Sequence, residues 1–197
     1  NLLLKDSHNE KDIFNLWFVD SSQYANDRVS DGYAWVTDEQ ISWYEEKAGE
    51  LREQNEGNPV PSLLFQHIPV PEIYEVLSPV TKETAGAVRG HRTYKDKYYV
   101  MNRELVTEGT MEEAPCPPDI NNGQFESWKK QGDILAAFFG HDHVNDFNGV
   151  YDGIHLIYTP GAGFYSYGKI GGHGLRIVEL DENDLLHFKT RMVCFSD

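Results

Sequence analysis

The first 60 residues show a pattern of apolar and polar positions that predicts a hairpin followed by a helix. Residues 2–4 and 13–19 are apolar runs on either side of a polar turn, which is typical of two antiparallel strands. Thr37 stands three residues before Gln40, and this spacing is the pattern of a capping box. The helix is expected to end near residues 55–57, and its apolar stripe is Ile41, Tyr44, Ala48 and Leu51.

Two later segments have the pattern of strands that are covered on both faces. Residues 62–68 and 133–139 are short and almost entirely apolar, as buried strands of parallel sheets usually are. A helix is predicted over residues 125–130, and Gly132 suits the left-handed position that ends such a helix. Residues 154–158 predict a further strand.

The remaining segments are a polar stretch and a C-terminal hairpin. Residues 78–122 are polar and rich in turn formers, so we expect an irregular insertion with one strand at 98–100. Residues 175–180 and 185–192 alternate in polarity, which predicts a hairpin with a four-residue connection at 181–184. The order of elements predicts an α/β fold, a layered sheet with helices on one face.

Composition narrows the class of protein. With 197 residues and 40% hydrophobic positions, the chain is expected to form one globular domain over residues 1–197. Its net charge of −15 argues against nucleic-acid binding, which depends on a basic surface. No apolar run approaches the roughly 18 residues of a membrane span, so no membrane partner is expected. Two cysteines, Cys116 and Cys194, are too few for a disulfide framework and leave the compartment open.

Histidines occur directly after both buried strands. His67 ends one strand, and His141 and His143 lie in the loop that follows the other. Active sites of layered α/β proteins collect at such strand ends. Gly140 permits a sharp turn that would present both imidazoles of the His-x-His pair to neighbouring metal positions. Imidazole nitrogen suits Zn, Fe and Mn, so the pattern indicates a metal site.

Each of these histidines also has a simpler interpretation. A strand-end histidine is often a hydrogen-bonded structural residue, and a His-x-His pair in a loop need not bind metal. Asp142 and Asn145 are expected to orient the ring N–H groups from behind, as second-shell partners do. A hydrogen-bonded structural role is favoured for His8, His155, His173 and His187.

Two longer blocks make the metal interpretation more specific. Residues 65–72 (FQHIPVPE) and 139–147 (FGHDHVNDF) resemble two signature blocks of the calcineurin-like metallophosphoesterases. The resemblance is nearest to the purple-acid-phosphatase-like branch, and it covers most of the chain outside residues 78–122. Further similar blocks follow in family order at residues 14–21, 32–36, 158–164 and 167–169.

The resemblance implies a fold, a set of ligands and an activity. The fold is the C-terminal half of a β-sandwich flanked by helices, in four α/β/β/α layers in the intact protein. His67 and His141 would bind one ion of a dinuclear pair and His143 the other, and the ions would be Fe, Mn or Zn. Such a pair hydrolyses phosphate esters because the cations hold the phosphoryl group and activate water. The expected partner is a small phosphorylated substrate.

Several family blocks are absent from the chain. Asp-x-His, Gly-Asp-x-x-Asp and Gly-Asn-His blocks are expected upstream, and they include the histidine that assists the leaving group. We therefore assign no catalytic residue here. Gly90-His91-Arg92 lies in the polar insertion and lacks the asparagine. The three histidines offer at most two ligands to one ion and one ligand to the other. A metal ion in a protein usually has three or four protein ligands. We expect the chain to be an inactive piece of a longer protein. Whether this piece binds metal by itself stays open.

Two other functions stay open at this point. A non-catalytic binding or scaffold module would have kept the fold and lost the upstream ligands. A mononuclear zinc hydrolase would use the three histidines alone. Because half a sandwich leaves part of a sheet face uncovered, the chain is expected to self-associate or to pair with a complementary half. The substrate is not identified, although Phe164, Tyr165 and Tyr167 are candidates to line a pocket.

Overall fold

The computed structural model describes residues 1–26 and 28–195, which form a mixed α/β structure. Its main feature is a seven-stranded sheet in the order β1-β2-β3-β8-β10-β9-β7. The α-helices of the described residues are α1 (Asp38–Gln54) and α2 (Gln124–Gln131). The strands are β1 (Leu2–Lys5), β2 (Asp12–Phe18), β3 (Ser62–Phe65), β4 (Leu77–Val80), β5 (Val88–Arg89), β6 (Tyr98–Met101), β7 (Val106–Glu108), β8 (Ile134–Phe139), β9 (Asn148–Tyr151), β10 (Ile154–Tyr158), β11 (Gly174–Glu179) and β12 (Lys189–Cys194).

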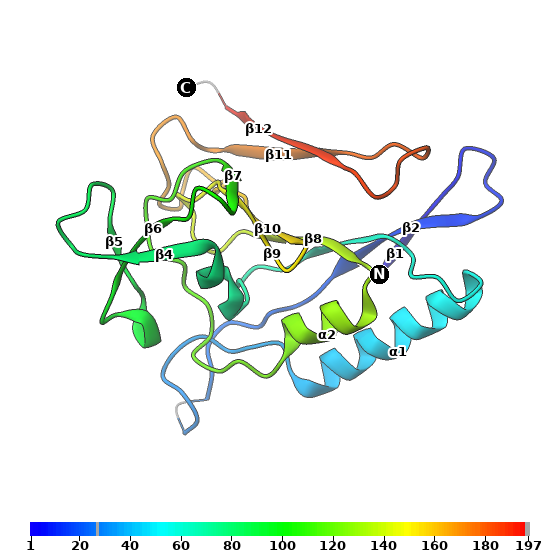
Figure 1. Cartoon of the computed structure of the whole chain (residues 1–197), viewed down its shortest axis with the longest axis horizontal. Helices are drawn as coiled ribbons and strands as arrows, with labels where there is room; N and C mark the ends of the chain where they lie inside the picture. Colours follow the sequence, from blue (N-terminus) through cyan, green and yellow to red (C-terminus); the bar gives the residue numbers. More distant parts are fainter. Residues whose placement is uncertain (27, 196–197) are drawn as a thin grey trace.

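The sheet has a different cover on each face. Helices α1 and α2 lie side by side along one face, and the hairpin β11–β12 runs along the other (Figure 1). The larger core cluster, which includes Trp17, Tyr44 and Trp128, fills the helical side. A smaller cluster around Phe14 and Phe138 lies beneath the hairpin. The predicted α/β class and the placement of the helices on one face are therefore confirmed.

Four neighbouring strands of the sheet are parallel. β2 pairs with β3, β3 with β8, and β8 with β10, all in the same direction. The predicted strands at 62–68, 133–139 and 154–158 are confirmed as β3, β8 and β10, although β3 ends at Phe65. Parallel pairing puts the carboxyl ends of all four strands at one edge of the sheet. The loops that carry His67 and His141 therefore start from the same edge.

The predicted helix boundaries are confirmed by their caps. The Thr37 hydroxyl accepts a hydrogen bond from the Gln40 backbone N–H, and the Gln40 side chain accepts one from Thr37. Helix α2 ends at Gly132, whose φ of 70° lies in the left-handed region that a glycine adopts without strain. No described helix is long and apolar enough to cross a membrane.

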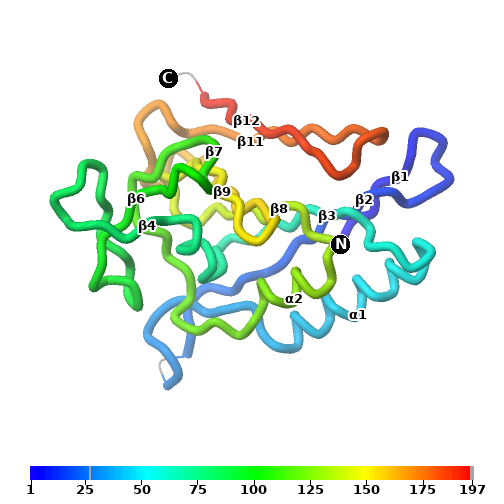
Figure 2. The backbone as a smooth tube through the Cα atoms, viewed as in Figure 1, coloured from blue at the N-terminus to red at the C-terminus, as the bar shows by residue number. Residues whose placement is uncertain are grey.

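The polar segment 78–122 is more regular than its sequence suggests. Strands β4, β6 and β5 form a separate antiparallel sheet, and β7 joins the edge of the main sheet beside β9. Figure 2 shows this small sheet at the end of the molecule opposite the β1–β2 hairpin. The strand predicted at 98–100 is confirmed as part of β6, but the prediction of an otherwise irregular segment is wrong. Strands of two to four residues are too short to show a clear alternation.

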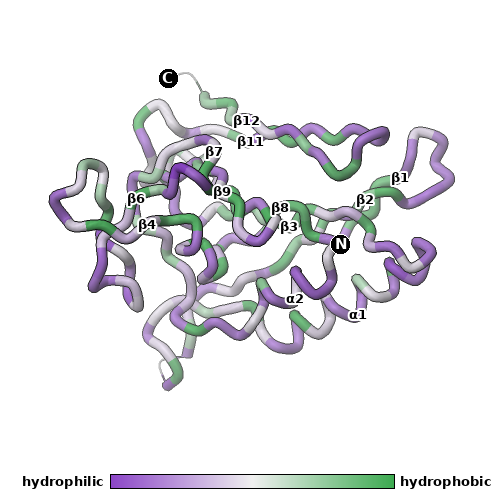
Figure 3. The backbone as a smooth tube through the Cα atoms, in the orientation of Figure 1, coloured by the Kyte–Doolittle hydropathy of each residue, from purple (hydrophilic) through white to green (hydrophobic). Residues whose placement is uncertain are grey.

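The C-terminal hairpin has a longer connection than predicted. Glu179 pairs with Lys189, so nine residues, 180–188, join the strands instead of four. Leu180, Leu185 and Phe188 do not extend the ladder because they pack against the apolar cluster of the main sheet. Hydrophobic positions are concentrated on the central strands, whereas helix α1 is largely hydrophilic (Figure 3).

One buried carboxyl group joins three elements of the helical layer. Asp133, immediately before β8, accepts a hydrogen bond of 2.9 Å from the Trp17 indole N–H and another from the Tyr44 hydroxyl. Burial raises the pKa of Asp133, and these donors oppose that rise. The contact connects β2, α1 and β8 through a group that is costly to leave unpaired.

We expect Tyr44→Phe to lower the free energy of unfolding by about 1–3 kcal/mol, because the buried Asp133 loses a donor. Urea unfolding followed by circular dichroism measures the change. Tyr165→Phe is the matched control, because Tyr165 is fully exposed, and it should shift stability by less than about 0.5 kcal/mol. Equal stability of the two variants would contradict the proposed role of the buried network.

Candidate metal site at the carboxyl edge of the sheet

The candidate ligands lie where the parallel strands end. Residues Asp20, His67, His141 and Gly161 each lie within three residues of the end of β2, β3, β8 and β10, respectively. Open sheets of this kind bind ligands at the carboxyl ends of their strands. The topology therefore gathers four loops that are far apart in sequence.

The rings of His67 and His141 are in direct contact. His67 Nε2 and His141 Nδ1 are 3.1 Å apart, and the ring centroids are 4.9 Å apart at an interplanar angle of 84°. The backbone holds the two loops together, because Gly140 N–H donates to the His67 carbonyl at 3.2 Å. Ser21 fixes the first loop by accepting from Ile68 N–H at 2.9 Å. The predicted convergence of these two imidazoles is present in the structure.

Both rings are held in the neutral form near pH 7. Burial, followed by the charges of the neighbouring His67, His143 and His91, lowers the pKa of His141 to about 4. Burial, followed by the charge of His143, also lowers the pKa of His67. A neutral imidazole keeps a lone pair, which is the form that binds metal.

The charge of His143 acts on both rings of this pair, but the His143 ring is fixed by a different loop. Its Nδ1 is 3.0 Å from the Tyr167 carbonyl oxygen and 3.0 Å from the Ser166 hydroxyl. The Tyr167 ring stacks on the imidazole with centroids 4.5 Å apart. Gly161 leaves room for the ring, because a Cβ there would approach His143 Cγ to 3.3 Å. A donor bond from Nδ1 to the carbonyl leaves the Nε2 lone pair available for a ligand.

The His67–His141 geometry fits a shared cation. Metal–nitrogen bonds of about 2.0–2.1 Å place two ligand nitrogens of one ion roughly 3 Å apart. The observed separation of 3.1 Å between His67 Nε2 and His141 Nδ1 matches that value. Within residues 1–26 and 28–195, however, no group of three or more His, Cys, Asp or Glu side chains is arranged to hold an ion. The described residues thus supply part of a coordination sphere.

Asp142 and Asn145 have partners other than the ring N–H groups expected from the sequence. The Asp142 carboxylate accepts from the Tyr158 hydroxyl at 2.5 Å and from Cys116 N–H at 3.1 Å. Asn145 accepts from Glu112 and Glu113 N–H at 2.9 and 3.2 Å. Both side chains are buried and join the second histidine loop to residues 112–116. They hold the loop itself in place, and burial raises the pKa of Asp142 to about 6.

Two residues near the histidines, Tyr33 and Glu113, were not singled out from sequence. The Tyr33 ring meets His141 edge-on with centroids 4.3 Å apart. The Tyr167 hydroxyl donates to Glu113 Oε1 at 3.0 Å. Of the three aromatic candidates after β10, Tyr167 lies against His143, Phe164 packs near His173, and Tyr165 is fully exposed. Tyr33 lies in the block of residues 32–36 that resembles the family, and this resemblance was the sequence signal that could have identified it.

The remaining histidines have the local partners of structural residues. His155 Nδ1 is 3.0 Å from Asn148 Oδ1, and His173 Nδ1 is 3.0 Å from the Gly161 carbonyl oxygen. His187 pairs with Asp184 on the surface. The structural role expected for these three is confirmed. Cys116 and Cys194 are both free thiols.

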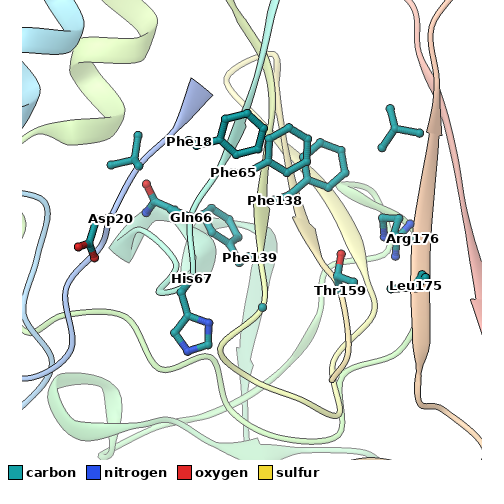
Figure 4. A pocket seen from close by; sticks show the side chains of 13 residues that line it. Phe18, Asp20, Phe65, Gln66, His67, Phe138, Phe139, Thr159, Leu175 and Arg176 are labelled. Atoms are coloured by element: carbon teal, nitrogen blue, oxygen red, sulfur yellow. The ribbon is translucent and has the colours of Figure 1, made fainter. Parts of the chain in front are cut away.

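An apolar groove of about 610 Å³ opens beside His67, between the main sheet and β11. Phe18, Phe65 and Phe138 stack in a row along it, with centroids 5.4 and 4.9 Å apart. Figure 4 shows these rings above His67, with Arg176 and Leu175 on the opposite wall. Phe18 remains 57% exposed, so the hairpin covers this face only in part.

We expect the chain to bind Zn²⁺ weakly. His67→Asn and His141→Asn should each lower the Zn²⁺ affinity at least about tenfold, because losing a metal ligand should lower the affinity no less than losing an outer-shell partner does. Isothermal titration calorimetry measures the affinity. His187→Asn removes an exposed histidine elsewhere and serves as the control. Unchanged affinity in both site variants would contradict the fit described above.

Comparison with known proteins finds sequence similarity to three plant proteins. No family model matches the chain, and no solved structure is significantly similar to it. Three curated proteins of Arabidopsis thaliana do match. "Probable inactive purple acid phosphatase 14" is 31% identical over 177 residues, "Probable inactive purple acid phosphatase 29" 29% over 180, and "Probable inactive purple acid phosphatase 28" 26% over 168.

These matches include 85–88% of the chain but only 36–40% of each relative. The chain thus spans about two-fifths of the length of these relatives. Over most of its own length, it is similar to plant proteins that are named as purple acid phosphatases and as probably inactive.

Proposed function

We propose that this chain is part of a purple-acid-phosphatase-like metallophosphoesterase that hydrolyses phosphate esters as a complete protein. In this proposal His67 and His141 bind one metal ion and His143 binds a second. The observation that carries it is the 3.1 Å separation of the His67 and His141 nitrogens at the carboxyl edge of the sheet. The similarity to plant proteins named as probable inactive purple acid phosphatases supports the relation to this family, but not the turnover.

The described residues would prepare the site for that chemistry. Bound Fe, Mn or Zn ions would hold the phosphoryl group and lower the pKa of a water molecule. His67 and His141 keep their lone pairs at neutral pH because burial lowers the pKa of both rings. The Tyr167 carbonyl group fixes the ring of His143. Loops held by buried hydrogen bonds keep these rings in a fixed geometry, as a catalytic site requires.

The chain alone is expected to be inactive. Two imidazoles for one ion and one for the other leave both coordination spheres short of the usual three or four protein ligands. In this proposal the remaining ligands and the group that assists the leaving oxygen come from the part of a longer protein that this chain does not include.

A non-catalytic function is the second candidate, and the comparisons favour it specifically. All three relatives carry the word "inactive" in their names. A protein that keeps the fold and part of the ligand set can bind a phosphorylated molecule without hydrolysing it. The two candidates share a binding site and differ only in turnover, so one experiment separates them.

We expect the complete parent protein, loaded with Mn²⁺ or Zn²⁺, to hydrolyse an aryl phosphate. His141→Asn should reduce kcat/KM by more than about 100-fold, since even outer-shell partners of metal ligands cost up to that much. His187→Asn should leave the rate unchanged. Release of the aryl alcohol measures the rate, and calorimetry with inorganic phosphate measures binding.

The possible results are distinct. Phosphate binding that depends on His141 but comes without hydrolysis would favour the non-catalytic module. The absence of both binding and hydrolysis would contradict the assignment of this site.

We also propose that the apolar groove is covered in the longer protein by the part that this chain lacks. Phe18 and Leu175, both more than half exposed, lie beside the stacked Phe65 and Phe138 and form an apolar face that is costly to leave in water. The relatives have more than half of their length outside the matched region. When the chain is isolated, a second copy of the same chain can cover this groove.

The isolated chain is therefore expected to self-associate, and Phe18→Ser should shift it toward the monomer. Light scattering over a range of concentrations measures the molar mass. Tyr165→Ser changes another exposed aromatic residue and should leave the association as it is. A wild-type chain that stays monomeric at high concentration would contradict this proposal.

A further inference from the structure

The polar segment after β4 brings a fourth histidine toward the candidate metal site. His91 faces Tyr33, with ring centroids 6.2 Å apart at an interplanar angle of 29°. Tyr33 in turn meets His141 at 4.3 Å. The charge of His91 is close enough to contribute to the lowered pKa of His141. A residue of the insertion thus lies at the edge of the histidine site, although its sequence block lacks the family pattern.

Tyr33 and His91 belong to a row of rings that leads away from the candidate metal position. His67 and His141 are at the inner end of the row. Tyr24 is at the outer end, 5.6 Å from Tyr33 at an angle of 22°, and is 74% exposed. We refer to Tyr24, Tyr33 and His91 as the aromatic wall. Its rings extend from the His67–His141 pair to the solvent-exposed Tyr24.

A set of ionic and polar contacts fixes the aromatic wall. Arg92 adopts a φ of 44°, unusual for a residue with a side chain, and its guanidinium group binds Asp119 at 2.7–3.0 Å as well as Asp31. Gly32 lies beneath the guanidinium group, where a Cβ would approach Arg92 Nε to 2.6 Å. Strained backbone that persists in this way is characteristic of functional sites.

The backbone of His91 is held from the other side. Its N–H donates to the Tyr74 hydroxyl at 3.0 Å, and that hydroxyl donates to the Pro115 carbonyl at 2.9 Å. Among residues 1–26 and 28–195, neither the Tyr33 hydroxyl nor the His91 ring has a hydrogen-bond partner, so both keep polar groups available for a ligand. These contacts fix the loops around residues 30–33 and 91–92, while the Tyr33 hydroxyl and the His91 ring nitrogens keep their capacity for hydrogen bonds.

We propose that the aromatic wall is the binding surface for the organic group of the phosphate ester, and that it selects planar, aromatic groups. This inference rests on the proposed function, because the phosphate must be held at His67, His141 and His143. The wall begins next to His141, so a group attached to that phosphate would meet Tyr33 and His91 first. Flat rings favour planar ligands through stacking and edge contacts, which an alkyl group does not make.

Two probes with the same phosphate and different organic groups test the proposal. Phenyl phosphate and methyl phosphate are titrated by calorimetry into the complete parent protein in the presence of saturating Zn²⁺. Wild type is expected to bind phenyl phosphate about fivefold more tightly, within the range typical of one aromatic contact. Tyr33→Ala and His91→Ala should each bring the ratio of the two affinities close to one. Tyr33→Phe should keep it, because the ring remains.

The controls separate a binding surface from a packing role. Tyr165→Ala removes an exposed aromatic residue elsewhere and should retain the wild-type ratio. Circular dichroism verifies that each variant is folded. The ratio of the two affinities in wild type tests the proposal even if a variant fails to fold. Equal affinity for both probes in wild type, or a retained preference in folded His91→Ala, would overturn the inference while the proposed function stands. If neither probe binds, the proposed function fails and this inference fails with it.

Discussion

Parallel pairing of β2, β3, β8 and β10 is the constraint on which the rest of the structure depends. Because these strands run in one direction, their carboxyl ends share an edge, and loops separated by more than 70 residues meet there. The contact between His67 and His141 at 3.1 Å is the direct result. Buried hydrogen bonds that Ser21 and Asp142 accept then fix the loops, so the imidazoles lie on a rigid base.

The same sheet explains why the site is partial. Its helical face is filled by the larger core cluster, whereas the other face is covered only by one hairpin and leaves stacked phenylalanines in an open groove. The set of metal ligands is also incomplete, because the described residues bring only two imidazoles together and add a third that acts on them through its charge. Both features fit a chain that spans about two-fifths of its purple-acid-phosphatase-named relatives.

Much of the fold could be predicted because its signals are local. The Thr37 capping box, the left-handed Gly132 and the apolar runs of β3 and β8 each determine structure within a few residues. The short strands of residues 78–122 and the connection at 180–188 depend on distant partners, so no local pattern could show them. For the same reason, sequence identified the histidines, but not the Tyr33–His91 contact or the true partners of Asp142.

The central claim is that His67 and His141 bind one cation at the edge of the sheet and that His143 binds a second cation beside it. Paramagnetic broadening of the imidazole resonances by substoichiometric Mn²⁺ tests it most directly, because broadening declines steeply with distance from the ion. The account predicts selective loss of these three signals, while those of His8, His155 and His187 stay sharp. Equal broadening of all histidines, or broadening that spares His67 and His141, would contradict it.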